Sequence, residues 1–266
     1  MTVYILVDGS YFCFYRYHAI KSWWKFATPD IELDETSVAF ADKFRSTFID
    51  KMIEIPKKLK VHKQNPVIMV GKDCPQQNIW RMAEYADYKG TRSSNGSEHI
   101  ATYFRMVYGD NLFQAGGATE ILHHPHLEAD DCIAIATQRL LAREPDAHIY
   151  IITSDTDYLQ LVSDRVKIFT MQYKELVNSK TYCGDPERYL FCKTILGDKS
   201  DNIPRVFSKC GPKTALKLWD DKDSFETKLD AEEGARERYE HNRRLISFRE
   251  IPGDIYTEFC AAHPYL

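Results

Sequence analysis

The sequence lacks long apolar runs, paired cysteines and an excess of basic residues, and each absence excludes a class of protein. The apolar run in "MTVYILVDGS" is far too short for a signal peptide or a membrane span, and no later segment reaches membrane length. The seven cysteines are odd in number and include no CxxC pair, which is typical of reduced thiols that pack as small hydrophobic side chains. We therefore expect a soluble intracellular protein.

The net charge of −4 gives the chain no basic footprint as a whole, which argues against a nucleic-acid partner. That argument loses its force where several acids surround cations, because a bound metal cancels their charge locally. The hydrophobic content of 44% and the charged content of 28% are ordinary for a globular protein. The 266 residues are enough for one large domain, or for one domain with an appendage.

Strand-like and helix-like segments alternate along the chain. Four short β-rich runs end in turns, at residues 3–7, 66–70, 148–153 and 166–170. Helix-like segments lie between them, notably at 38–55 and 129–143. This alternation predicts an α/β fold with a mainly parallel sheet. Functional sites in such sheets lie beyond the carboxyl ends of the strands, where Asp8, Asp73 and Asp155 follow three of these runs.

Three further segments differ from this pattern. Between residues 74 and 127 the periodicity weakens, and the polar "RSSNGSEH" predicts a loop or mobile helices over the sheet edge. Residues 189–219 hold six Lys/Arg against two carboxylates, in short helical pieces broken by Gly and Pro, which predicts a basic, helix-turn-helix-like appendage. The tail from residue 223 is charged and helix-prone, and we expect it to pack back on the main domain.

Nine acidic side chains stand at strand ends or in motif turns: Asp8, Asp73, Glu128, Asp130, Asp131, Asp155, Asp157, Asp198 and Asp201. Each alone is explained as a turn residue, a helix cap or a partner of a helix dipole. Together they suit hard divalent cations, which prefer oxygen ligands, and a two-metal site needs several carboxylates around ions about 4 Å apart. The chemistry that fits is the in-line attack of a metal-activated water on a phosphodiester.

The ordered set "VDGS … GKD … LEADD … SDTD … GDKSDNIP … GPKTA" resembles the 5′ nuclease, or flap endonuclease, family, which includes phage 5′→3′ exonucleases and the nuclease domain of bacterial DNA polymerase I. The resemblance runs from residue 3 to about residue 220. It implies a PIN-like (Rossmann-like) α/β domain at 1–188 with a helical arch at about 74–127, a helix–three-turn–helix that grips duplex DNA at 189–222, and C-terminal helices at 223–266 that pack on the nuclease domain.

The resemblance also implies two Mg²⁺ or Mn²⁺ ions and divides the acids between them. The acids nearest the first ion are Asp8, Asp73, Glu128 and Asp130. Those nearer the second are Asp131, Asp155, Asp157 and Asp201. Asp198 completes the metal-ligand set and is the one acid that we do not count as catalytic.

Basic and aromatic side chains complete the expected site. In "YADYKGTR" and just upstream of it, Lys89 and Arg81 correspond to the family's catalytic contacts to the scissile phosphate at the base of the arch; without the family context they would be read as a solvated basic loop. The expected DNA-binding residues are Phe14, Arg16, Tyr88, Lys89, Arg92, Lys209, Gly211, Lys213 and Thr214. The hairpin "IPRVFSKCGPKTA" has fewer glycines than the family pattern, which keeps the phosphate contact but disfavours the family's K⁺ site.

The resemblance implies a stand-alone, structure-specific 5′→3′ exonuclease or 5′-flap endonuclease that hydrolyses DNA, and RNA primers, during replication or repair. Its partners would be DNA with a 5′ flap or a free 5′ end and RNA–DNA hybrids, bound by a monomer, in the bacterial cytoplasm if the chain is phage-encoded. Two alternatives stay open. One is a PIN-type ribonuclease, and the other is a non-catalytic DNA-structure-binding protein on the same fold, which the full set of acids argues against.

Overall fold

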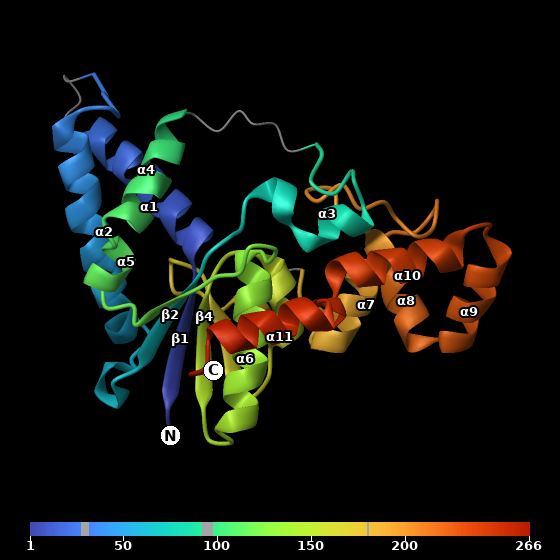
Figure 1. Ribbon diagram of the computed structural model, residues 1–266. Helices are drawn as coiled ribbons and strands as arrows, with labels where there is room; N and C mark the ends of the chain where they lie inside the picture. The colour runs from blue at the N-terminus through green and yellow to red at the C-terminus, as the bar shows by residue number, and fades with distance from the viewer. Residues whose placement is uncertain (28–31, 92–97, 180) are drawn as a thin grey trace.

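The structure, a computed structural model, describes residues 1–27, 32–91, 98–179 and 181–266. Its centre is a five-stranded sheet in the order β3-β2-β1-β4-β5, in which every pair of neighbours is parallel (Figure 1). The strands are β1 (Val3–Asp8), β2 (Val67–Gly71), β3 (Glu120–Leu122), β4 (His148–Ile152) and β5 (Val166–Phe169). The expected α/β fold with a parallel sheet flanked by helices is therefore confirmed.

The central strand β1 is buried along its whole length because helices cover both faces of the sheet. Val3, Ile5 and Val7 belong to one hydrophobic core, whereas Tyr4 and Leu6 belong to the other. This alternation is the two-residue period of a strand. Asp8 is the last residue of β1, so the strand delivers its carboxylate to the carboxyl edge of the sheet.

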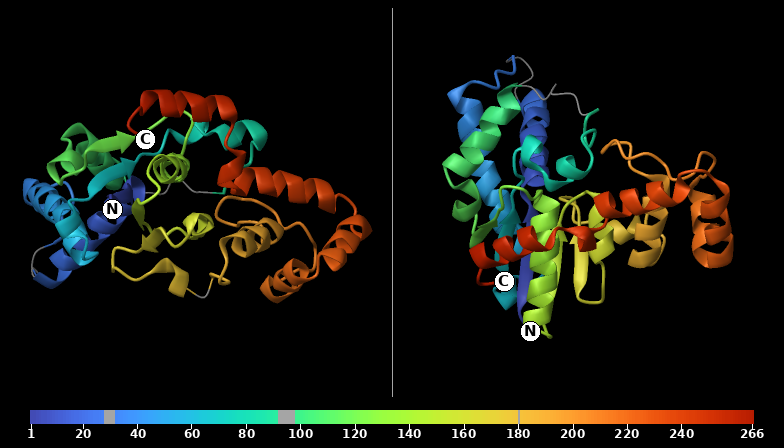
Figure 2. Two further views of the ribbon diagram at one scale, coloured as in Figure 1. Left: turned by 90° about the horizontal axis from the view of Figure 1, so that it is seen from below. Right: turned by 45° about the vertical axis from the view of Figure 1, so that its right-hand side comes forward.

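One helical layer packs on each face of the sheet, as the two views of Figure 2 show. The first layer consists of α1 (Gly9–Ala27), α2 (Val38–Lys58), α4 (Glu98–Gly109) and α5 (Leu112–Ala115). It buries many aromatic rings, among them Phe12 and Phe48, whose centroids lie 4.9 Å apart in an edge-to-face contact. The second layer consists of α6 (Ala129–Arg143) and α11 (Gly253–Ala262), and its core includes Ile133 and Phe259.

The segment between residues 74 and 127 contains a strand that its sequence did not predict. It contains α3 (Trp80–Glu84), and it contains β3, which pairs with β2 at the sheet edge. Tyr103 and Val107 of α4 are buried in the first core rather than raised over it. The helices expected in this segment are present as α3, α4 and α5, and residues 92–97 of "RSSNGSEH" lie outside the described residues. Strand β3 was not expected, because a strand of three residues is too short to show a period.

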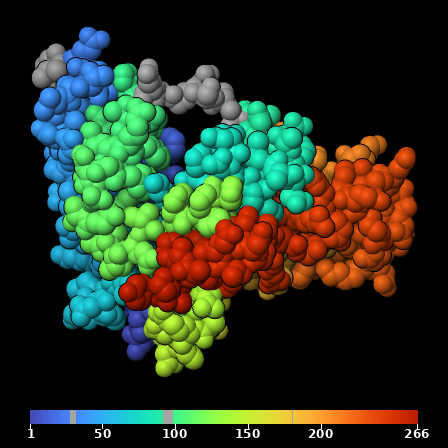
Figure 3. All heavy atoms as spheres, viewed as in Figure 1, coloured from blue at the N-terminus to red at the C-terminus, as the bar shows by residue number. Residues whose placement is uncertain are grey.

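Four helices form a second lobe beside the sheet: α7 (Pro186–Leu196), α8 (Pro212–Asp220), α9 (Lys222–Ala231) and α10 (Ala235–Ile246). Figure 3 shows this lobe beside the sheet lobe, with α11 laid along the front of the latter. The lobe has its own core, which includes Phe191 of α7, Leu218 of α8 and Phe225 of α9. The tail from residue 223 therefore divides, because α9 packs on the α7–α8 pair and only α11 packs on the sheet.

Short 3₁₀ helices connect these elements at His62–Gln64, Gln76–Asn78, Thr156–Leu161, Leu176–Asn178 and Phe248–Glu250. Among the described residues, none of the helices has both the length and the apolar character that a membrane crossing needs.

Candidate metal centre

A cavity of about 290 Å³ opens at the carboxyl edge of the sheet. It lies where the chain order reverses around β1, between neighbours β2 and β4, which is the usual position of a site in an α/β sheet. The lining residues come from the ends of β1, β2 and β4, from the starts of α1 and α6 and from the segment after α3: Asp8, Ser10, Tyr11, Asp73, Lys89, Glu128, Ala129, Asp130, Thr153, Ser154 and Asp155. Five expected metal ligands and one expected catalytic lysine therefore share one cavity.

Asp8 is fixed at the end of β1 by hydrogen bonds to both oxygens of its carboxylate. Its Oδ1 accepts from the backbone N–H of Tyr11 at 2.9 Å, and its Oδ2 accepts from the Thr153 hydroxyl at 3.0 Å. Only 9% of the residue is exposed. Burial raises the pKa of Asp8 to about 7, and the nearby carboxylate of Asp73 adds to the rise. Ionisation of Asp8 therefore costs free energy unless a cation binds next to the carboxylate.

Asp73 links the β2 edge of the site to α6. Its Oδ1 accepts a 2.8 Å hydrogen bond from the backbone N–H of Ala129, the first residue of that helix. Its Oδ2 accepts from the hydroxyl of Ser10. A carboxylate at a helix N-terminus is stabilised by the helix dipole and by the free N–H groups of the first turn.

The start of α6 brings three acids together. Glu128 precedes the helix, and its backbone N–H donates to Asp131 Oδ2 at 3.3 Å, while Asp130 accepts from the backbone N–H of Asp131 at 2.8 Å. Desolvation raises the pKa of Asp130, and its neighbours Asp131 and Glu128 raise it further. Oxygen ligands from all three lie within 4.8 Å of one another.

Arg81 does not line the cavity, contrary to the expectation that it contacts the scissile phosphate. Only 2% of it is exposed, and both terminal nitrogens lie 2.7 Å from the two oxygens of Asp131 in a bidentate pair. One of them also lies 3.1 Å from Glu128, and Nε donates to the carbonyl of Leu245 at 2.7 Å. Burial alone would lower the pKa of Arg81, but the two carboxylates outweigh it and keep the guanidinium charged. Arg81 is thus a buried strut between α10 and the acids.

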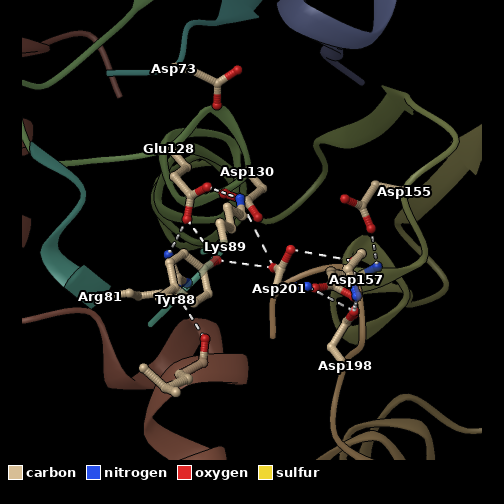
Figure 4. Close-up of polar contacts among 12 residues, drawn as sticks. Asp73, Arg81, Tyr88, Lys89, Glu128, Asp130, Asp155, Asp157, Asp198 and Asp201 are labelled. Carbon is tan, nitrogen blue, oxygen red and sulfur yellow. Dashed lines mark hydrogen bonds and ion pairs between the residues drawn. The ribbon is translucent and has the colours of Figure 1, made fainter. Parts of the chain in front are cut away.

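Tyr88 also faces the acids rather than solvent. Its hydroxyl lies 3.0 Å from Glu128 Oε2 and 3.1 Å from Asp201 Oδ2, and only 3% of the residue is exposed. Figure 4 shows its hydroxyl directed at both carboxylates. An exposed DNA-contacting role for Tyr88, as expected from its motif, does not fit this burial.

Lys89 reaches the cavity from a left-handed backbone with φ of 56°. Its backbone N–H donates to the carbonyl of Asp201 at 2.9 Å, and its ammonium pairs with Glu128. A non-glycine residue in this region of φ costs free energy and is held there by its surroundings. The sequence expectation of a cation at the site thus fits Lys89 and does not fit Arg81.

A second group of acids lies beside the first. Carboxylate oxygens of Asp157, Asp198 and Asp201 lie within 4.8 Å of one another, and Figure 4 shows Asp201 between Asp157 and Glu128. The expected division of the acids therefore changes in two respects. Asp155 lines the first cavity, and Asp131 belongs with Glu128 and Asp130 and is engaged by Arg81.

Lys193 of α7 stands inside the second group, where its ammonium pairs with Asp157 and lies 2.9 Å from Asp198 Oδ2. Burial opposes ionisation of Asp198, but Lys193 and hydrogen bonds from Ser200 outweigh it and lower the pKa of Asp198 to about 2. No motif points to Lys193, and the one signal in the sequence is its place in the basic segment, five residues before Asp198.

Both groups of acids fit hard divalent cations. Their side chains offer only oxygen donors, and the raised pKa values of Asp8 and Asp130 record repulsion and desolvation that a cation would relieve. Three residues to which the sequence assigned no role support the acids. The Ser10 hydroxyl donates to Asp73, the Thr153 hydroxyl donates to Asp8, and the indole N–H of Trp80 donates to Asp131 at 3.1 Å.

The expected DNA-binding residues fall into different environments. Phe14 is 45% exposed on α1 and stacks parallel to His18, with centroids 6.4 Å apart, whereas Arg16 is 93% buried and does not fit a DNA contact. Lys209 and Lys213 are exposed before and within the start of α8. Gly211 precedes that helix with open space where a Cβ would be, and Thr214 is partly buried. Arg92 lies outside the described residues.

The family model for the 5′-3′ exonuclease N-terminal resolvase-like domain matches residues 3–185. The chain belongs to this 5′-3′ exonuclease family. The match confirms the expected enzyme class, a 5′ nuclease. It includes the first group of acids and Asp157 of the second group, and it ends before Asp198 and Asp201.

Curated relatives extend the match along the chain. The 5′-3′ exonuclease of Halalkalibacterium halodurans is 26% identical over 255 residues, which cover 93% of this chain and 80% of that protein. DNA polymerase I of Treponema pallidum is 33% identical over 150 residues, which cover 52% of this chain but only 14% of the polymerase.

Solved structures of the T5 5′-exonuclease share the fold. One T5 protein co-crystallised with metal ions aligns with a TM-score of 0.69 at 18% identity, over 99% of this chain and 98% of the other. Another, with zinc described as bound, gives the same values. A complex of the bacteriophage T5 flap endonuclease with DNA and metal ions aligns with a TM-score of 0.68 at 17% identity.

The raised pKa of Asp8 predicts a pH dependence of stability. Without divalent ions, the folded state keeps a proton on Asp8 between pH 3.8 and about 7, where the unfolded chain has released it. The folded state then binds more protons, so the free energy of unfolding should fall as pH rises through this window and level off above it. Urea unfolding in EDTA across this range measures the effect.

Asp8→Asn provides the comparison, with Asp146→Asn at an exposed position as the matched control. At pH 8 in EDTA, Asp8→Asn should be more stable than the wild type by on the order of 4 kcal/mol, because the pKa of Asp8 rises from 3.8 to about 7 and each pKa unit corresponds to about 1.4 kcal/mol. Equal pH profiles for wild type and Asp8→Asn would contradict the raised pKa.

Proposed function

We propose that the chain is a divalent-metal-dependent 5′→3′ exonuclease and 5′-flap endonuclease that hydrolyses phosphodiester bonds in DNA. The observation that carries the proposal is the cavity in which five carboxylates and Lys89 meet at the carboxyl edge of the sheet. A protein that only bound DNA would gain nothing from carboxylates that face phosphate. The family assignment and the T5 fold support the same conclusion.

The proposed cofactors are two Mg²⁺ or Mn²⁺ ions. Asp8, Asp73, Glu128 and Asp130, with Asp155 beside them, would hold the first, and Asp157, Asp198 and Asp201 the second. Bound there, the ions supply an activated water and charge stabilisation for in-line displacement at phosphorus. The oxygen-only donor set favours these ions over softer metals.

The side chains of the protein itself divide the remaining work. Lys89 places a positive charge on the cavity wall, where it can offset charge that develops on the phosphoryl oxygens. Arg81, which is paired with Asp131, positions Glu128 through a hydrogen bond to its carboxylate. Lys209 and Lys213 would bind duplex phosphates near the start of α8, and Phe14 would stack on an unpaired base.

The proposed substrates are DNA with a 5′ flap or free 5′ end and RNA–DNA primer hybrids, cut by a monomer in replication or repair. The proposed division is a nuclease domain at 1–188, whose arch lies within 74–127, a duplex-binding α7–α8 region at 189–222 and C-terminal helices at 223–266. A substrate panel tests this: 5′-flap DNA should be cut, and the same flap with a bulky block on its 5′ end should be cut far more slowly. Cleavage confined to single-stranded RNA would instead favour a PIN-type ribonuclease.

Replacing Lys89 tests its assignment to the phosphate. Lys89→Met should lower the single-turnover rate on 5′-flap DNA by about 10²-fold, because one preorganised charge at a developing oxyanion contributes roughly that much. Mn²⁺ binding measured by calorimetry should persist. Lys63→Met, at an exposed position away from the cavity, is the control. An unchanged rate for Lys89→Met would remove Lys89 from the catalytic set.

A further inference from the structure

Lys193 occupies the place of a cation among the acids of the second group. Its ammonium bridges Asp157 and Asp198, and the side chains of these three residues are only 11%, 15% and 18% exposed. An ammonium so enclosed gives up hydration and is held by its carboxylate partners. The bridge therefore neutralises part of the charge that would otherwise attract a divalent ion.

The turn that follows α7 places Asp198 next to Lys193. Helix α7 carries Lys193 in its last turn and ends at Leu196, and Gly197 then turns the chain with φ of 67°. A Cβ at Gly197 would lie 2.4 Å from the carbonyl oxygen of Ile203, so the tight turn requires glycine. This turn brings Asp198 back to the lysine that precedes it by five residues.

Asp198 divides its two oxygens between a turn and the lysine. Oδ1 accepts from the backbone N–H of Ser200 at 2.7 Å and from its hydroxyl at 2.6 Å, and Oδ2 faces Lys193. The oxygen that is directed at Lys193 is thus the one that is free of the turn. A divalent ion that used this oxygen would compete with the ammonium.

The two acid groups differ in their access. Asp8, Asp73, Glu128 and Asp130 line an open cavity, whereas Asp157 and Asp201 do not line it. Lys193 and Asp198 instead line a separate cavity of about 610 Å³ beside α7 and α8. This cavity gives the lysine side chain a space into which it can withdraw.

We propose that Lys193 is a built-in competitor for the second divalent ion, which binds only as the ammonium leaves Asp157 and Asp198. The second ion therefore binds more weakly than the first, and removal of the ammonium strengthens its binding. This inference rests on the proposed two-ion function. It adds a positioning residue that sets the occupancy of one ion and leaves the other unaffected.

The test is a titration of the full chain with Mn²⁺, in which electron paramagnetic resonance measures free Mn²⁺ for the wild type, Lys193→Met and Lys193→Arg. In the wild type, the second ion should bind at least about tenfold more weakly than the first. Lys193→Met should tighten the second ion by about tenfold or more and leave the first unchanged. Lys193→Arg, which keeps the charge, and Lys167→Met, at an exposed position on β5, should behave as the wild type.

A second readout covers the case in which loss of the lysine destabilises the ion-free protein by leaving acids unpaired. The gain in melting temperature on adding Mn²⁺ should then be larger for Lys193→Met and Lys193→Gln than for the wild type, because a ligand that binds the folded state more tightly stabilises it more. Unchanged or weakened second-ion binding in both variants would overturn the inference while leaving the nuclease proposal in place. Absence of Mn²⁺ binding by the wild type and every variant would overturn both.

Discussion

Asp130→Asn should abolish cleavage of 5′-flap DNA, with a loss of at least about 10³-fold in the single-turnover rate, while DNA binding is largely retained. Asp130 lines the cavity together with Glu128, Asp8 and Asp73, and its own pKa is raised by burial and by acidic neighbours. An amide keeps the size of the side chain but removes the charge that a divalent ion requires. The proposed duplex-binding surface around Lys213 is not altered.

Two measurements separate these effects. Rapid-quench kinetics give the rate of the chemical step, and fluorescence anisotropy in Ca²⁺ or EDTA gives the DNA affinity. Asp146→Asn, an exposed acid beyond the far end of α6, is the matched control and should keep the wild-type rate. An Asp130→Asn variant that cuts at a wild-type rate would remove Asp130 from the catalytic set.

Arg81→Ala should destabilise the fold by about 3–5 kcal/mol and remove most of the activity. The substitution leaves Asp131, which is fully buried, without its bidentate partner, and a buried charge without a partner is expensive. It also leaves the Leu245 carbonyl in the last turn of α10 without its hydrogen bond from Arg81 Nε. Arg81→Lys should recover only part of the loss, because an ammonium cannot reproduce the planar fork.

Urea unfolding of the Arg81 variants and a matched control measures how much Arg81 contributes to the free energy of unfolding. The double variant Arg81→Met with Asp131→Leu should recover part of the stability that Arg81→Ala loses, since both charges are removed together. The double variant should stay inactive, because Glu128 loses its support. Arg105→Ala, an exposed arginine of α4, is the control. If Arg81→Ala were as stable as Arg105→Ala, the buried-strut assignment would be wrong.

The sheet and most of the acids could be predicted because their signals are local. A strand covered on both faces is a continuous apolar run, and an aspartate directly after it must lie at the carboxyl edge, as Asp8 does. Strand β3 could not be predicted, because three residues are too few to show a period. Its pairing partner β2 also lies about 50 residues earlier in the sequence. The order of the motifs along the chain identified the family, which the local periodicity of strands and helices could not do.

The roles of the basic residues depended on burial, which a sequence motif does not report. Arg81 and Lys89 lie eight residues apart in one basic segment, yet one faces Asp131, 50 residues further along the chain, and the other faces the cavity. Tyr88 and Arg16 likewise occur in DNA-binding motifs but lie inside the protein. The grouping of the acids differs from the expected one for the same reason. Asp131 is buried against Arg81 and does not line the cavity, whereas Asp155 does.

The most direct test of the account is cleavage of a labelled 5′-flap DNA by the wild-type protein in Mn²⁺, in Mg²⁺ and in EDTA, with analysis of the ends produced. Cleavage should occur only with a divalent ion, and the products should carry a 5′-phosphate and a 3′-hydroxyl that a polymerase can extend. Cleavage in EDTA, or binding of the flap without cleavage in either ion, would contradict it.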